Sequence, residues 1–187
     1  MRKIFIGVLV STIFIACNND KKTDAGSSTS STTTSASDKK PASELLDISM
    51  GDMVKRSAEA FAKGDIDGRV ANMADNVRVL WSSGDSLVGK QAAKDYFQKR
   101  WSIIDSATAT EQIVLPIQVN EPQSKFTPAG KWILHWYLSS VKYKNGKRLT
   151  FWVHNANHLN DEGKIDVCAI YLDRYPIMEA TKDLMRK

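Results

Sequence analysis

The chain has 187 residues, of which 42% are hydrophobic and 25% charged, and its net charge is +5. Six basic and three acidic side chains fall in the first 42 residues, so the remaining chain has a net charge of about +2. So weak a charge, with no stripe of Arg and Lys interleaved with aromatic residues, argues against nucleic acid as a partner.

The first residues form a short basic and then apolar segment. Arg2 and Lys3 precede an apolar run that ends at Ala16, directly before Cys17. The run is shorter than the about 20 apolar residues that span a bilayer, and it is typical of a signal peptide. Its last residues, FIAC, resemble the lipobox of bacterial lipoproteins, in which the cysteine becomes the lipidated N-terminus.

We therefore expect a signal peptide over residues 1–16 and attachment to a membrane through lipidated Cys17. The expected location is the bacterial cell envelope, on the outer membrane or the periplasmic side. The alternative is an ordinary secretory signal with an incidental cysteine.

Residues 17–42 are rich in Ser, Thr and other polar residues and contain no apolar pattern. Such a segment cannot offset its ordering entropy, which predicts a disordered tether. Residues 43–187 have the length of one domain. Cys168 is the one cysteine of this domain, so no disulfide can form within it.

The predicted domain begins with helices and continues with strands. Apolar residues at helical spacing predict a first helix over 45–63, which Gly64 ends. Asp65 is expected to cap a second helix over 66–73. Asn145-Gly146 predicts a two-residue hairpin turn. The other predicted elements are strands over 77–81 and 86–88, a helix over 90–104, strands over 108–119, 131–143, 147–159 and 164–173, and a short helix after residue 176.

This order predicts an α+β fold with a meandering antiparallel sheet. Together with VKRSAEAFAKGDIDGRVANMADNVRVLW near its start and NDEGKIDVCAIYLD near its end, it resembles the nuclear transport factor 2-like superfamily. That group includes ketosteroid isomerases and SnoaL-like polyketide cyclases. Over residues 47–175, the resemblance implies a cone-shaped, cystatin-like barrel. A curved antiparallel sheet would wrap around the N-terminal helices and leave an apolar pocket on its concave side. The convex side would form a homodimer.

The resemblance also implies where catalytic groups would lie. The isomerases use a tyrosine on the first helix, an aspartate base after the first strand and a protonated aspartic acid ahead of the GK turn. Counted from the GD and GK pairs, these positions fall on Ser57, Trp81 and Asn155. An indole cannot take a proton from carbon, so the isomerase mechanism is absent. Asn155 can still donate a hydrogen bond to a ligand oxygen.

A two-residue turn at 145–146 would pair Trp136 with Asn155 across the hairpin formed by the strands predicted over 131–143 and 147–159. Side chains alternate between the two faces of a strand. Trp136 and the asparagines then share the more apolar face, which we predict to be the pocket, and His154 faces away. The predicted ligand-binding residues are Ser57, Trp81, Trp136, Asn155 and Asn157.

Two of the chain's three histidines, His154 and His158, lie on one predicted strand. At ~3.3 Å per residue they are about 13 Å apart, too far to share a metal ion. We therefore expect no metal and no cofactor. A register shifted by one residue would turn His154 into the pocket, where it could act as an acid or base.

The sequence thus predicts a lipid-anchored, non-catalytic domain that binds a small apolar ligand or a partner segment. Two alternatives stay open. One is a SnoaL-like enzyme of isomerase, cyclase or hydrolase type, with His154 as a weak catalytic candidate. The other is an assembly protein that acts through a dimer face.

Overall fold

A computed structural model describes residues 40–125 and 127–185. The predicted signal peptide, Cys17 and the predicted tether up to residue 39 lie outside the described residues. Within the described part, no helix has the length and apolar character needed to cross a membrane.

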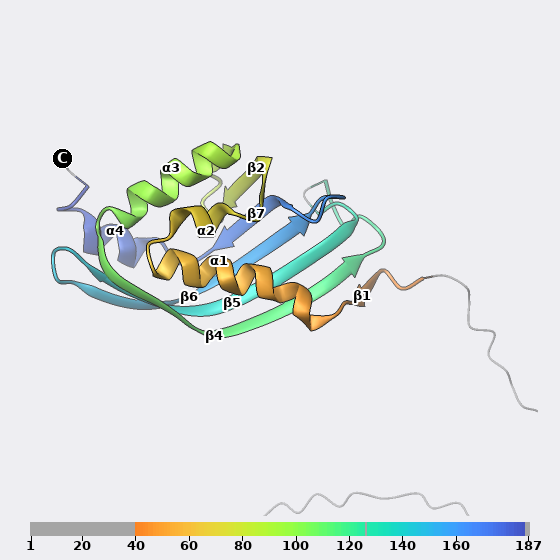
Figure 1. Ribbon diagram of the computed structural model, residues 1–187, viewed down its shortest axis with the longest axis horizontal. Coiled ribbons are helices and arrows are strands. Elements are labelled where there is room, and N and C mark those ends of the chain that lie inside the picture. Colours follow the sequence, from red (N-terminus) through yellow and green to blue (C-terminus); the bar gives the residue numbers. More distant parts are fainter. Residues whose placement is uncertain (1–39, 126, 186–187) are drawn as a thin grey trace, which may run out of the picture. The chain divides into compact units, whose positions relative to one another are not determined.

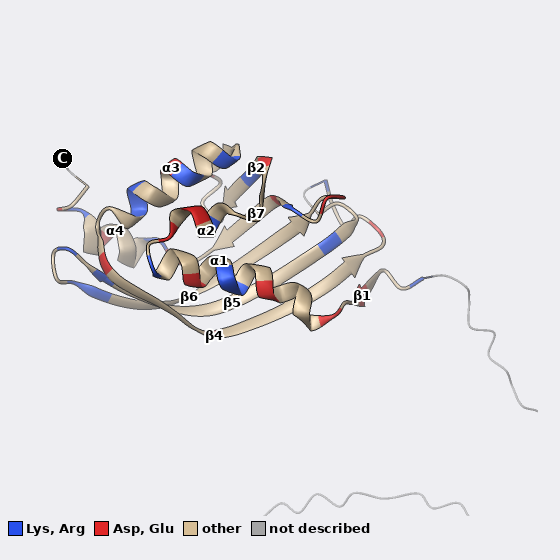
Figure 2. Cartoon of the chain, viewed as in Figure 1, with Lys and Arg blue, Asp and Glu red and all other residues tan. Residues whose placement is uncertain are grey.

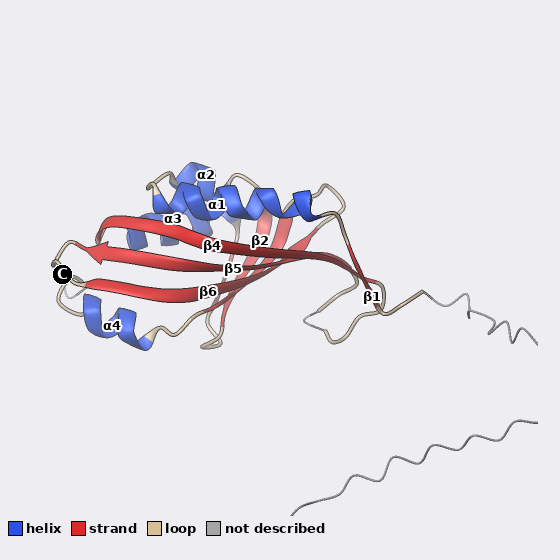
Figure 3. Cartoon of the chain, turned by 90° about the horizontal axis from the view of Figure 1, so that it is seen from below, coloured by secondary structure: helices blue, strands red, loops and turns tan. Residues whose placement is uncertain are grey.

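The described chain is an α+β fold, as predicted, with a seven-stranded sheet. Helices α1, α2 and α3 lie together over one face of the sheet (Figures 1 and 3). The elements are β1 (Ser43–Leu45), a 3-10 helix (Ile48–Gly51), α1 (Asp52–Ala62), α2 (Ile66–Val70), β2 (Met73–Trp81), β3 (Ser86–Val88), α3 (Lys90–Trp101), β4 (Ile104–Val119), β5 (Gly130–Tyr143), β6 (Arg148–Leu159), β7 (Ile165–Tyr171) and α4 (Tyr175–Thr181).

The start of the domain differs from the single long helix that was predicted. Leu45 ends a short strand that pairs with β4, so the helical segment begins only after Asp47. The Asp47 carboxylate accepts a hydrogen bond from the Ser49 amide at 2.8 Å and caps the 3-10 helix that leads into α1. At α2 the prediction is confirmed, because the Asp65 carboxylate accepts from the Gly68 amide at 2.8 Å.

The strand order is β1-β4-β5-β6-β7-β2-β3. The predicted antiparallel meander is confirmed for β4 to β7, whereas β2 and β7 run parallel, a pairing that was not predicted. Parallel neighbours need a long connection. Here the connection is nearly the whole domain, because the chain leaves β2 for the far side of the sheet and returns through β4, β5 and β6 (Figure 1).

The β5–β6 hairpin has a three-residue loop, residues 144–146, instead of the predicted two. Tyr143 donates its amide to the Lys147 carbonyl at 2.9 Å, and Gly146 closes the loop with a left-handed φ of 85°. The extra loop residue shifts the register by one, so Trp136 pairs with His154 and not with Asn155. A one-residue shift turns every side chain of β5 to the other face relative to β6.

The concave face of the sheet packs against α1, α2 and α3 to form the main core. A second cluster gathers around α4, where Ile177 and Ala180 pack against Ile104 and Tyr143. Both clusters and all seven strands lie within the described residues. We therefore expect this part of the chain to fold without residues 1–39.

Candidate functional site

A cavity of about 100 Å³ lies between the concave face of the sheet and helices α1, α2, α3 and α4. Its charged lining residues are both basic, Arg69 and Arg100, and no Asp or Glu of the described residues lines it. Most of the wall is apolar. Its aromatic lining residues include Phe61, Trp81, Tyr96, Phe97, Tyr137 and Phe151.

Trp81 ends β2 beside β7, where it is paired with Ile170, another residue of the cavity wall. Its ring lies 4.8 Å from the ring of Tyr96 on α3, measured between centroids. Trp81 therefore lies on the cavity wall, and its contact with a ligand stays a prediction.

Ser57 on α1 is buried and forms two hydrogen bonds with Arg69. The Ser57 hydroxyl donates to the Arg69 carbonyl at 2.7 Å and accepts from Arg69 Nη1 at 3.1 Å. The guanidinium carbon lies 4.6 Å from the centre of the Phe97 ring, a cation–π arrangement. It is Arg69, and not Ser57, that lines the cavity.

Arg69 was missed in the sequence, although one signal could have found it. Ile66 and Arg69 are three residues apart on α2, so both lie on the same helix face. Ile66 packs against the main core, which turns that face inward. Arg69 is only 7% exposed as a result.

Asn155 and Asn157 are both buried on the concave face, as predicted. The Asn157 amide donates to the Ile133 carbonyl at 3.1 Å. Asn155 hydrogen-bonds with Tyr137. Burial raises the pKa of Tyr137, and the charge of Arg69 and the hydrogen bond of Asn155 make this increase smaller. The Asn155 Oδ1 atom has no hydrogen-bond partner among the described residues. Ligand contact by either asparagine stays a prediction.

His135 is a second residue that the sequence did not single out, because the predicted register put it on the convex face. It is fully buried beside Tyr137, with 4.9 Å between ring centroids. Burial, with smaller effects of Arg69, Lys55 and His154, lowers its pKa to about 4. Its Nε2 lies 3.1 Å from the carbonyl oxygen of the Gln112 side chain. His135 is therefore neutral, and Nε2 is the nitrogen that donates.

Trp136 is on the other side of the sheet. It lies between Ile113 and His154 on the convex face, with its ring centroid 4.4 Å from that of His154. The prediction that Trp136 shares the pocket face with the asparagines is wrong, and the three-residue hairpin loop is the reason.

The histidines of β6 are on the convex face, as predicted. His154 is packed between the rings of Trp136 and Tyr171, and burial lowers its pKa. His158 Nδ1 lies 2.6 Å from an Asp166 carboxylate oxygen, and its Nε2 lies 3.3 Å from a backbone carbonyl. Both ring nitrogens of His158 are thus engaged by the protein. Among the described residues, no three His, Cys, Asp or Glu side chains come together as metal ligands do.

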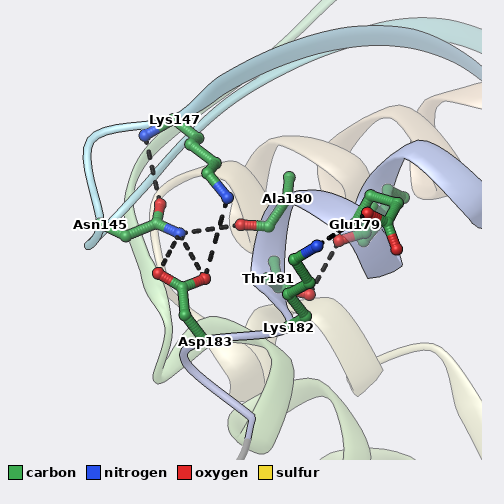
Figure 4. A network of polar contacts seen from close by, with 8 residues as sticks. Asn145, Lys147, Glu179, Ala180, Thr181, Lys182 and Asp183 are labelled. Carbon is green, nitrogen blue, oxygen red and sulfur yellow. Dashed lines mark hydrogen bonds and ion pairs between the residues drawn. The ribbon is translucent and has the colours of Figure 1, made fainter.

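Helix α4 closes one end of the cavity, because Ile177 is part of the wall. Its C-terminal end is held by the β5–β6 hairpin (Figure 4). The Asn145 side-chain amide donates to the Ala180 carbonyl at 2.8 Å and to the Asp183 carboxylate at 2.9 Å. Lys147 lies 3.9 Å from the same carboxylate. A second hollow of about 100 Å³ adjoins the cavity at Arg100 and reaches the exposed Met178.

No family model and no curated protein matches the sequence. The fold, however, is similar to that of solved structures. A proposed polyketide cyclase from Xanthomonas campestris aligns over 70% of this chain and 94% of its own, with a TM-score of 0.55 and 16% identity. A protein of unknown function from Burkholderia pseudomallei, described as nuclear transport factor 2-like, aligns over 70% and 95%, with a TM-score of 0.52 and 18% identity.

An epoxide hydrolase-like protein from Mycobacterium tuberculosis aligns over 72% of this chain and 90% of its own, with a TM-score of 0.50 and 14% identity. The chain has the nuclear transport factor 2-like fold. At these identities the likeness shows the fold alone, because this fold hosts many activities.

The convex face of the nuclear transport factor 2-like domain is apolar across four strands. Ile113, Trp136, His154 and Tyr171 form one row of paired neighbours from β4 to β7. Trp152 projects from β6 beside this row and is 51% exposed. The middle of β5 and β6 carries no charged residue, and the basic residues gather at the hairpin end (Figure 2).

Proposed function

We propose that the domain binds a small organic molecule in the cavity between the sheet and the helices. The observation that carries this proposal is an internal space with aromatic walls and a buried guanidinium. Ligand sites are typically concave and mostly apolar, with a few polar groups that fix orientation. Trp81, Tyr96 and Phe151 would supply the walls, and Arg69 and Tyr137 the polar contacts.

The size of the cavity limits the ligand. Sites for drug-sized ligands measure roughly 300–1,000 Å³, whereas a dry cavity of about 150 Å³ admits benzene. A cavity of about 100 Å³ is smaller than that and accepts a short chain. A longer ligand would extend past Arg100 into the adjoining hollow, beside α4.

The groups around the cavity favour binding over catalysis. Trp81 stands where the isomerases of this fold have their base, and no carboxylate of the described residues lines the cavity. His135 is held neutral by burial and is not part of the wall. Tyr137 keeps its proton because burial raises its pKa. Turnover of a small ketone or epoxide by the purified protein would contradict this proposal.

Native mass spectrometry of the chain from residue 40 onward, purified without detergent from its own organism, tests for a bound molecule. We expect an additional mass that is lost on denaturation. Ser139→Phe would place a ring in the cavity and should abolish that mass. Ser140→Phe is the matched control, because the neighbouring residue of β5 points to the opposite face and should leave the mass in place. Equal retention by both variants would place the molecule elsewhere.

We also propose, from the sequence, that Cys17 carries a lipid that holds the domain at a bacterial membrane. Cys17→Ser should move the full-length protein from the membrane fraction to the soluble fraction. Unchanged fractionation would refute the lipid anchor.

The apolar convex face is best explained by a second copy of the chain, which would cover Trp136, Trp152 and Tyr171. Sedimentation velocity of the chain from residue 40 onward should then show a dimer. Trp152→Glu should yield a monomer, since it would bury a charge without a partner in the interface. A monomeric parent protein would exclude this pairing.

A further inference from the structure

Arg69 is a buried cation whose charge has no counterpart. Its side chain forms no ion pair with a carboxylate of the described residues. Its partners are the neutral Ser57 hydroxyl and the face of Phe97, and its Nε has no hydrogen-bond partner in the described part of the chain. Buried charges are normally paired, because removal from water costs several kcal/mol.

The groups around Arg69 do not supply the missing negative charge. Cys168 and Tyr137 are fully or nearly buried, and burial raises the pKa of each, so both stay protonated and neutral near pH 7. His135 is neutral as well. Arg100, the other charged residue of the cavity wall, adds a second positive charge. The interior therefore has an excess of positive charge that a monoanion would offset.

We propose that the cavity takes a small organic carboxylate, with its carboxylate group against Arg69 and its apolar body between Phe61 and Phe151. This inference rests on the proposed function and specifies its ligand class. A guanidinium presents several donors in a planar fork that matches a carboxylate, and Arg69 is a residue of the cavity wall.

The rest of the wall selects a monocarboxylate over phosphate or a polyanion. Apart from the two arginines, Ser139 and the tyrosine hydroxyls, the wall consists of apolar and aromatic side chains such as Phe97, Val153 and Ile170. These cannot satisfy further charged oxygens, which would be left without partners. The cavity volume of about 100 Å³ leaves room for a short chain behind the carboxylate, and a ring would extend into the adjoining hollow of about 100 Å³.

The test compares two acids with their neutral amides, which have nearly the same shape. Benzoate and benzamide, and hexanoate and hexanamide, are titrated into the ¹⁵N-labelled chain from residue 40 onward, and Kd is measured from amide shifts. We expect each carboxylate to bind at least tenfold more tightly than its amide, the range of a charge-assisted hydrogen bond. The largest shifts should fall on the cavity strands, around Ser139 and Phe151.

Arg69→Met, which keeps the length of the side chain but removes the charge, should abolish the preference for the carboxylates. Arg56→Met is the matched control and should keep the preference, because Arg56 on α1 is exposed and does not line the cavity. If Arg69→Met does not fold, Arg69→Lys replaces it. This variant keeps the charge but lacks the planar fork of donors, so it should weaken carboxylate binding severalfold and leave amide binding unchanged.

The possible results separate the two proposals. Amides that bind as tightly as acids would overturn the anion inference and leave the small-molecule site standing. A carboxylate preference that survives loss of the Arg69 guanidinium would overturn the role of Arg69. Absence of binding by all four compounds would overturn both the inference and the proposed function.

Discussion

His135 should make the stability of the domain depend on pH in a defined window. In the unfolded chain its pKa is 6.5, whereas in the folded protein burial lowers its pKa to about 4. Between these values the unfolded chain binds a proton that the folded protein refuses. The free energy of unfolding therefore decreases as the pH falls from 6.5 to 4, and it is unaffected by His135 above that range.

The size of the effect follows from the shift of the pKa. A change of one unit corresponds to 1.36 kcal/mol, so the full loss below pH 4 is about 3 kcal/mol. Between pH 7 and pH 5 the loss is about 2 kcal/mol. A typical domain has only 5–15 kcal/mol of stability, so this change is easily measured.

Urea denaturation of the chain from residue 40 onward, followed by tryptophan fluorescence, gives the free energy at each pH. His135→Gln is the informative variant, because its amide can still donate to Gln112 but does not titrate. The free energy of unfolding of the parent protein, relative to that of His135→Gln, should decrease by about 2 kcal/mol from pH 7 to pH 5.

His154→Gln is the matched control on the convex face. It removes a histidine that burial affects less, and it should keep the His135 part of the pH dependence. If His135→Gln loses as much stability on acidification as the parent protein, the buried neutral state of His135 is refuted.

Two further predictions concern stability. Asn145→Ala removes the hydrogen bonds that hold α4 and should lower the hydrogen-exchange protection of α4 amides about tenfold, as for the loss of about 1.4 kcal/mol. Asn160→Ala, at the β6–β7 turn, is the control and should leave α4 unchanged. Gly130→Ala would put a methyl group 2.5 Å from the His158 ring and should cost about 1–3 kcal/mol more in thermal unfolding than Gly84→Ala. Gly84 also has a positive φ but faces open space, so equal costs would show that the contact with His158 is not tight.

The fold could be predicted because its signals are local. The apolar spacing on α1, the Asp65 cap and the alternation along the long strands each depend on a few neighbouring residues. The strand segment at Leu45 and the parallel pairing of β2 with β7 could not be read in this way. Both depend on contacts between residues far apart in the chain.

The pocket was predicted less well, and one residue of loop length explains most of the difference. Asn-Gly favours a two-residue turn, but it also fits the last two positions of a three-residue loop with glycine in the left-handed conformation. The sequence around Gly146 does not distinguish the two. The longer loop exchanges the faces of β5, so His135 and Tyr137 lie inside and Trp136 lies outside.

The same register determines both proposed surfaces of the molecule. It places Tyr137 beside Asn155 on the cavity side, and it aligns Trp136 with His154 and Tyr171 on the convex side. With the predicted two-residue turn, the Trp136 side chain would have filled part of the interior, and the His135 side chain would have lain on the convex face. The hairpin loop also presents Asn145 to α4, the helix that closes the cavity. A change in loop length would therefore alter the cavity, its closure and the convex face together, so the proposed ligand binding and the proposed pairing of two copies both depend on one short turn.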